Sequence, residues 1–598
     1  MSAASEPVEA LVRRCLAPGM KRQDSTELQR LGRQVSKAAA SGVFVERPLE
    51  VAVLSSFLAD FLVEALPAFF LRHNILAACA LGPYGAIATE ILAGRAADKD
   101  LTLILPTHRD LAHAPAPGCS EAEADAAVAR EARVWSELWE RTPGPVVQLS
   151  FDPPVTRALA EADGWAPGGR LRHVRRVNEA LRAAAPARVA MVDAEALAAR
   201  LGPLWRDQRL YHLCKQPFSP DALAEVADTL ASAAAGLLGR GRKALVLDLD
   251  NTLWGGVVGD DGLEGIVLGR ETAEGEPFTE LQEYAKALAS RGVALAVCSK
   301  NDHANAIEAF RSHPAMTLKE TDIACFVCNF DDKATNLREI ARRLNLGLEA
   351  LVFADDNPVE RAWVADALPQ VMVVDLPDDP AAYVEAIEAC HAFPVHRLTE
   401  EDLTRSQSYR VRSELAAIEE TAANIESFLS GLEPVAVVEH VGPGSCERIA
   451  QLVAKTNQFK LNRTLVTADE VAEAPERVLA IRLTDRLQDY GITAVAVLEP
   501  DGRTLNVKNW VMSCRVFSRR LENATLELLR VRAQEAGARR IRLDFEASPK
   551  NALVPPILRG LGFVEGEGGR YTLDLTGPPA GPLHHMRIVD RSGVRVEA

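Results

Sequence analysis

Four groups of polar residues in the middle of the chain have the types and the order that phosphoryl transfer requires. Each group directly follows a short apolar stretch. If these stretches are parallel strands, their carboxyl ends meet at one edge of a sheet, where open α/β sheets bind ligands. We therefore expect the groups to form one site. In chain order they are Asp248, Asp250 and Thr252, then Ser299, Lys300 and Asn301, then Lys333, and finally Asp355 and Asp356.

The residue types predict how the work is divided within this site. Asp248 can attack phosphorus as a carboxylate nucleophile, and Asp250 can act as general acid and base at the leaving group. Carboxylate oxygens are preferred ligands of Mg²⁺, the expected cofactor. The predicted metal ligands are Asp248, Asp250, Asp355 and Asp356. The residues predicted to bind the phosphoryl group are Thr252, Ser299, Lys300, Asn301 and Lys333.

The elements around these groups indicate a doubly wound parallel sheet. After a first strand that leads into Asp248, strands are predicted at residues 293–299, 324–330, 350–356 and 371–376. Helices are predicted to begin near Pro277, Asp302 and Lys333. This alternation is typical of a parallel α/β fold. The short spacings between the motifs leave no room for a large cap domain, so we expect an open cleft that admits bulky substrates.

Two further blocks flank this one and make the chain a multidomain α/β protein. The first has predicted strands at residues 51–57, 101–106, 145–151 and 187–193, with helices between them. The third has strands at 494–499, 504–513 and 540–546 around two helices, which indicates an α+β domain. The predicted boundaries are a helical lead-in at 1–45, an α/β domain at 46–240, the catalytic domain at 241–395, a helical connector at 396–430, an α+β domain at 431–576 and a tail at 577–598.

The amino-acid composition and the net charge indicate which kinds of binding partner are disfavoured. The 598 residues carry a net charge of −16, which disfavours nucleic acid and anionic membranes as partners. No apolar run is long enough to span a bilayer, and the N-terminus has no signal-peptide pattern. Ten scattered cysteines fit reduced thiols. We expect a cytoplasmic enzyme.

Five segments of the second block together resemble the FkbH-like family, subfamily IIIC of the haloacid dehalogenase (HAD) superfamily. They are VLDLDNTLWGGVVGDDGLEGIVLG, VCSKND, HPAMTL, DKATNLREIARRLNLGL and VFADDNPVERAWV, within residues 243–390. The resemblance implies an SGNH- or flavodoxin-like α/β region before the HAD-type sheet and a GNAT-like α+β region after it.

The same resemblance implies glyceryl loading in polyketide or related biosynthesis. The acyl phosphate of 1,3-bisphosphoglycerate, a small phosphorylated three-carbon substrate, is captured on a cysteine, and the remaining phosphate is removed. The glyceryl group then passes to the phosphopantetheine arm of an acyl carrier protein.

The family's cysteine corresponds to Cys298. The neighbouring Ser299 and Lys300 and a phosphate-binding helix start could lower the thiol pKa. The alternation in VALAVCS, however, also fits a small buried core residue. Two other readings therefore stay open: a Mg²⁺-dependent phosphatase of a small phosphate ester with a structural Cys298, and a docking scaffold for carrier proteins.

The flanking blocks carry weaker motifs. GNAT-like folds hold pyrophosphate on a glycine-containing turn, but here RVFSRR places Ser518 and Arg520 at the glycine positions, which impedes coenzyme A binding. The arginines that could meet a pantetheine phosphate are Arg515, Arg519 and Arg520.

In the first block, Ser55 and Ser56 stand where SGNH hydrolases carry their nucleophile. Asp207 and His212 lie late in that block but lack the DxxH spacing of those enzymes. We therefore expect a structural or docking role for this block.

Overall fold

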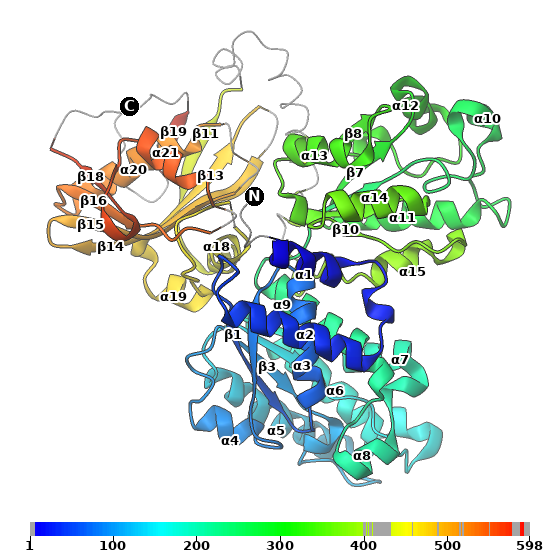
Figure 1. Cartoon of the computed structure of the whole chain (residues 1–598). Coiled ribbons are helices and arrows are strands. Elements are labelled where there is room, and N and C mark those ends of the chain that lie inside the picture. Colours follow the sequence, from blue (N-terminus) through cyan, green and yellow to red (C-terminus); the bar gives the residue numbers. More distant parts are fainter. Residues whose placement is uncertain are drawn as a thin grey trace. The chain divides into compact units, whose positions relative to one another are not determined.

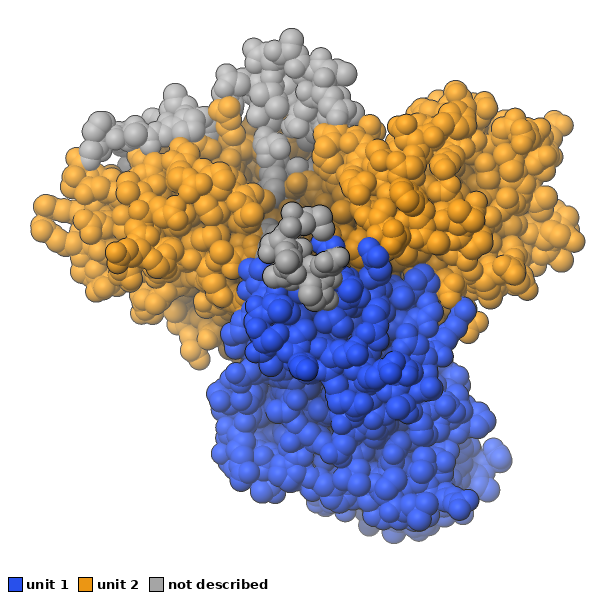
Figure 2. All heavy atoms as spheres, viewed as in Figure 1, with its two compact units in different colours: residues 1–241, 390–397 blue, residues 242–389, 398–598 orange. Residues whose placement is uncertain are grey.

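The computed structural model describes most of the chain and divides it into two compact units. The described residues are 6–398, 402, 403, 405, 409, 410, 432–456, 458–486, 489–513, 516, 519–548, 551–576 and 586–590. Unit 1 comprises residues 1–241 and 390–397, and unit 2 comprises residues 242–389 and 398–598 (Figure 2). Among the described residues, no helix is both long and apolar enough to cross a membrane.

Unit 1 contains a five-stranded parallel sheet in the order β2-β1-β3-β4-β5. Figure 1 labels two of its strands, β1 and β3. Its strands are β1 (Leu49–Ser55), β2 (Ala77–Leu81), β3 (Leu101–Leu105), β4 (Val146–Leu149) and β5 (Val189–Val192). The main helices are α3 (Asp60–Arg72), α4 (Ile87–Leu92), α5 (Glu121–Glu140), α6 (Arg170–Ala184), α7 (Ala194–Leu201), α8 (Gln208–Cys214) and α9 (Leu223–Leu237). Strand β2 is not predicted by the sequence analysis, because its segment AACAL is short, rich in small residues and only partly buried.

The lead-in belongs to this unit and is not a separate element. Helices α1 (Glu6–Leu16) and α2 (Ser25–Ala40) are joined through a short 3-10 turn. They contribute Met20, Leu28 and Leu31 to the same buried core as the sheet. Residues 390–397 also return to unit 1, where Ser232 on α9 donates to the His391 carbonyl at 2.6 Å. The contact-based division thus assigns residues 390–397 to unit 1, whereas the sequence analysis placed residues up to 395 in the catalytic domain.

A buried ion cluster ties the lead-in to α9. Lys21 Nζ lies 2.9 Å from Asp228 and 2.7 Å from Glu225, and the Asp228 side chain is fully buried. Burial alone would lower the pKa of Lys21, but attraction to Asp228 and Glu225 outweighs it and raises that pKa. Asp228 also contacts His73 at the end of α3, at 2.7 Å.

Lys21→Met should therefore destabilise unit 1 by about 3 kcal/mol, because the buried Asp228 carboxylate loses the Lys21 cation at 2.9 Å and retains the more distant Arg72, at 3.7 Å. Urea unfolding, with hydrogen exchange of α9 peptides to identify the transition, measures the change. Arg33→Met, which removes an exposed pair with Glu64, is the matched control and should cost less than about 0.5 kcal/mol. Equal effects of the two substitutions would contradict a stabilising role for the buried cluster.

The central domain of unit 2, residues 242–389, contains the predicted doubly wound sheet. All strands are parallel, in the order β10-β9-β6-β7-β8. They are β6 (Ala244–Leu247), β7 (Ala294–Ser299), β8 (Cys325–Cys328), β9 (Leu351–Ala354) and β10 (Met372–Val373). Its main helices are α10 (Val258–Gly265), α11 (Glu276–Ser290), α12 (His303–Ser312), α13 (Lys333–Leu344), α14 (Pro358–Ala367) and α15 (Tyr383–Glu388). The strand order reverses between β6 and β9, and this switch point is where such sheets bind ligands.

The C-terminal domain is a larger mixed sheet. Its strands are β11 (Val435–Glu439), β12 (Phe459–Lys460), β13 (Val478–Thr484), β14 (Asp489–Asp501), β15 (Thr504–Met512), β16 (Arg540–Asp544), β17 (Val564–Glu565), β18 (Arg570–Asp574) and β19 (Arg587–Asp590). Its main helices are α18 (Pro443–Lys455), α19 (Ala468–Glu473), α20 (Leu521–Glu535) and α21 (Val554–Gly560). Strand β19 lies within the predicted tail yet pairs in parallel with β11. Most of the predicted connector lies outside the described residues.

Candidate active site

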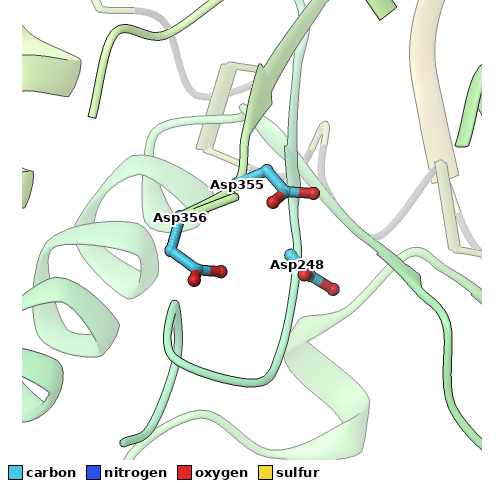
Figure 3. Close-up of side chains that lie close together, drawn as sticks. All are labelled: Asp248, Asp355 and Asp356. Carbon is cyan, nitrogen blue, oxygen red and sulfur yellow. The ribbon is translucent and has the colours of Figure 1, made fainter. Parts of the chain in front are cut away.

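Three carboxylates meet at the switch point of the central domain. Asp248 follows β6, and Asp355 and Asp356 follow β9 (Figure 3). Each offers one oxygen, and these oxygens lie within 4.8 Å of one another. Asp355 is fully buried, and Asp248 is 9% exposed. Among the described residues, this is the one group of three or more such side chains that could hold a metal ion.

Lys333, the first residue of α13, supplies the positive charge inside this group. Its Nζ lies 2.8 Å from Asp248 Oδ1 and 2.8 Å from Asp355 Oδ2, and it donates to the Cys298 carbonyl at 3.0 Å. Burial alone would lower the pKa of Lys333, but attraction to the two carboxylates raises it instead. The lysine is therefore a fixed cation between the carboxylates.

The charge balance of the group fits a divalent cation. Burial, and then repulsion from Asp248, raise the pKa of Asp355 to about 6, although Lys333 opposes this. Burial and Asp248 also raise the pKa of Asp356. One lysine cannot neutralise three clustered carboxylates, and a hard divalent ion such as Mg²⁺ matches their oxygen ligands.

The Asp250 side chain lies outside the metal group, contrary to the expectation that it is a fourth ligand. Its Oδ1 accepts hydrogen bonds from Trp254 Nε1 at 2.9 Å and from the Val258 backbone at 3.0 Å. Its Oδ2 accepts one from Asn301 at 2.7 Å. These three donors hold the carboxylate in place beside the metal group, an arrangement suited to a general acid and base.

The loop between Asp248 and Thr252 is held in an uncommon conformation. Asn251 has φ of 54°, in the left-handed region, and its carbonyl accepts a hydrogen bond from Tyr383 at 3.2 Å. Thr252 Oγ1 accepts from the Asp356 backbone at 3.1 Å and lies 3.2 Å from its carboxylate. Left-handed backbone of this kind is common at functional sites. The two Thr252 contacts join the loop after β6 to the loop after β9.

Two of the predicted phosphate-binding residues, Ser299 and Lys300, differ in how far they are buried. Ser299 is buried at the end of β7, with its hydroxyl 3.4 Å from Asn301 Nδ2. Lys300, in contrast, has a 42% exposed side chain that pairs with Glu360 at 2.6 Å. Asn301 thus links Ser299 to Asp250, whereas the exposed Lys300 ammonium is paired with Glu360 on α14.

Sequence reasoning missed Arg361, on α14. It donates to the carbonyls of Asp355 and Asp356, both at 2.7 Å, and so fixes the loop that carries two of the three carboxylates. Its position just after NPVE, at the start of a proline-initiated helix, was the available signal.

The expected lowering of the Cys298 thiol pKa is wrong. Cys298 is fully buried in a core cluster with Val246, Ala296 and Phe353. Burial raises its pKa, and the nearby Lys333 only partly opposes that rise. The alternating pattern of β7 thus places this side chain in the apolar layer, as the core interpretation required.

The flanking motifs fall in different places. Arg515 and Ser518 lie outside the described residues. Arg519 is buried and pairs within its own domain, with Asp485 at 3.3 Å and the Tyr490 hydroxyl at 2.5 Å. Arg520 has φ of 60° and immediately precedes α20. For the two described arginines, Arg519 and Arg520, the predicted phosphate-binding role stays a prediction.

The chain matches no known protein-family model and no curated protein. Among solved structures, it is similar to a protein that contains a phosphatase domain. That protein is the N-terminal part of BF1531 from Bacteroides fragilis, crystallised with Mg; the two share 29% identity over 63% of this chain and 100% of that one, with a TM-score of 0.56. This likeness supports the parallel α/β architecture; it leaves the SGNH-like assignment a prediction.

Acetyltransferases match a smaller part of the chain. The ribosomal-protein-S18-alanine N-acetyltransferase of Escherichia coli shares 16% identity over 24% of this chain and 96% of its own, with a TM-score of 0.19. The putative acetyltransferase yncA of Salmonella typhimurium was solved with acetyl-CoA. It shares 17% sequence identity with this protein, over 25% of this chain and 98% of its own, with a TM-score of 0.20. These scores are too low to carry a functional conclusion.

Proposed function

We propose that this chain is a Mg²⁺-dependent phosphatase of the HAD type. The convergence of Asp248, Asp355 and Asp356 around Lys333 is the observation that carries the proposal. The Mg-bound phosphatase domain of the similar Bacteroides fragilis protein supports it. A Mg²⁺ ion held by the three carboxylates would polarise a phosphoryl oxygen and offset charge.

The chain's own residues supply the covalent and proton-transfer steps. An Asp248 oxygen attacks phosphorus, the bond to the leaving oxygen breaks, and Asp250 donates the proton that the leaving group needs. Asp250 then accepts a proton from water as that water attacks the aspartyl phosphate, which releases phosphate and restores Asp248. Lys333, whose Nζ lies 2.8 Å from Asp248, offsets negative charge throughout.

Removal of the metal should abolish phosphate release. EDTA should lower the rate for p-nitrophenyl phosphate at least about a hundredfold, because the clustered carboxylates would then repel the anionic substrate. Added Mg²⁺ should restore the rate, and the thermal midpoint measured in parallel tests whether the protein stays folded. Undiminished activity in EDTA would exclude this mechanism.

The second candidate function follows from the family resemblance of residues 243–390: the substrate would be 1,3-bisphosphoglycerate, and the glyceryl group would pass to an acyl carrier protein in polyketide or related biosynthesis. The motif set in residues 243–390 supports this substrate class. The cysteine step of the scheme falls on Cys298, whose burial and raised pKa argue against a reactive thiolate. Hydrolysis of a simple phosphate ester remains the competing function.

Substitution of Cys298 separates these alternatives. From its burial we expect Cys298→Ala to cost about 1–2 kcal/mol of stability and to leave phosphate release within about threefold of wild type. After incubation with 1,3-bisphosphoglycerate, peptide mapping should then find no glyceryl increment on the Cys298 peptide. A hydroxylamine-labile increment on that peptide, together with lost carrier loading in Cys298→Ala, would instead establish the acyl-enzyme.

A further inference from the structure

Three residues with catalytic chemistry follow the strands of the unit 1 sheet, and the phosphatase reaction does not use them. The strand order places a second switch point between β1 and β3, where ligands commonly bind. Ser56 follows β1, His108 follows β3, and Asp152 follows the next strand, β4. The Ser56 backbone N–H donates to the Leu105 carbonyl at 3.1 Å, which holds the serine beside the end of β3.

His108 and Asp152 form an oriented pair. The ring Nδ1 lies 2.8 Å from Asp152 Oδ1, and the His108 backbone N–H donates to the same oxygen at 2.8 Å. The two residues are only 8% and 7% exposed. With the ring proton on Nδ1, where the carboxylate accepts it, Nε2 keeps a free lone pair. No hydrogen bond to Nε2 is formed among the described residues.

Short-range contacts hold the loop that carries His108. Thr107 donates its backbone N–H to Asp110 at 2.6 Å, and its hydroxyl accepts from Arg109 at 3.3 Å. The Arg109 guanidinium in turn lies 4.2 Å from the centre of the Tyr211 ring. These contacts hold the residues on either side of His108, and the Asp152 carboxylate holds the ring itself, which is the preorganisation that a catalytic base needs.

Of the two serines after β1, Ser56 is the one available for chemistry. Ser55 is 1% exposed, and its hydroxyl accepts a hydrogen bond from the Phe57 backbone at 3.1 Å. Ser56 is half-buried, and its hydroxyl makes one long bond, 3.5 Å, to the Leu105 carbonyl. That weak bond leaves the Ser56 hydroxyl able to turn towards the loop after β3.

We propose that Ser56, His108 and Asp152 form a second active site, for acyl transfer from an ester or thioester. The Ser56 oxygen attacks the acyl carbon while His108 Nε2 takes the hydroxyl proton. The carbon–oxygen or carbon–sulfur bond then breaks, and the leaving alcohol or thiol takes that proton. Water then attacks the acyl carbon of the Ser56 ester, the bond to the Ser56 oxygen breaks, and the acyl group leaves as a carboxylic acid while the Ser56 hydroxyl is restored. Asp152 is a positioning residue that holds the His108 ring.

A fluorophosphonate probe tests this proposal on the full-length protein. The Ser56 oxygen would displace fluoride from phosphorus, and intact mass with peptide mapping should find one adduct, on Ser56. The adduct should be absent in Ser56→Ala and should form at least about a hundredfold more slowly in His108→Gln. Ser41→Ala, an exposed serine of the same unit, is the control and should label like wild type.

The role of Asp152 is tested by a measurement that loss of a purely structural residue would not change, the pH dependence of the labelling rate. In Asp152→Asn the pH profile of labelling should move, and Asp152→Glu should recover much of the wild-type rate. Phosphate release should be unchanged in all these variants, so the two sites fail or succeed independently. Absence of an adduct on Ser56 in the wild-type protein, or equal labelling rates in wild type and folded His108→Gln, would overturn the proposal.

Discussion

Asp248→Asn should reduce phosphate release at least about a hundredfold, with substrate binding much less affected. The amide keeps the shape of the side chain but cannot attack phosphorus as an anion. Steady-state release of phosphate from p-nitrophenyl phosphate in saturating Mg²⁺ measures the loss. The fold should survive, because Asp248 makes its contacts at the end of β6 and not within the apolar layers.

Asp260→Asn is the control for this substitution. Asp260 is an exposed carboxylate on α10 of the same domain, and its removal should leave the rate unchanged. If Asp248→Asn retained near-normal activity, the nucleophile would have to be another group.

Lys333→Met should also lower the rate about a hundredfold, for an electrostatic reason. It removes the cation that lies 2.8 Å from both Asp248 and Asp355 and leaves buried carboxylates to repel each other and the phosphoryl oxygens. Lys300→Met is the matched control. Although the sequence predicts both lysines as phosphate ligands, Lys300 is exposed and paired with Glu360, so we expect less than a threefold change. Equal losses in the two variants would contradict the site described above.

The sequence predicted the location of the site better than the role of each side chain. Apolar strands followed by polar residues define the carboxyl edge of a parallel sheet, so Asp248, Asp355 and Asp356 could be grouped in advance. The direction of Asp250 could not, because it depends on the left-handed turn at Asn251 and on donors from Trp254 and Asn301.

Contacts between residues far apart in the chain could not be predicted from the sequence either. The His108–Asp152 pair joins residues far apart in the chain, and no sequence motif marks either one. Strand β19 is four residues long and forms only through its partner β11. In contrast, the period-two pattern of β7 already allowed a buried Cys298, and the structure agrees with that alternative.

Trapping of the phosphoenzyme tests the central claim most directly. Wild-type protein is mixed with a ³²P-labelled phosphate ester in Mg²⁺, quenched in acid within milliseconds, and digested for peptide mapping. We expect acid-stable, base-labile label on the peptide that contains Asp248, and none in EDTA or in Asp248→Asn. Label on a different peptide, or phosphate release without any labelled enzyme, would contradict an Asp248 nucleophile.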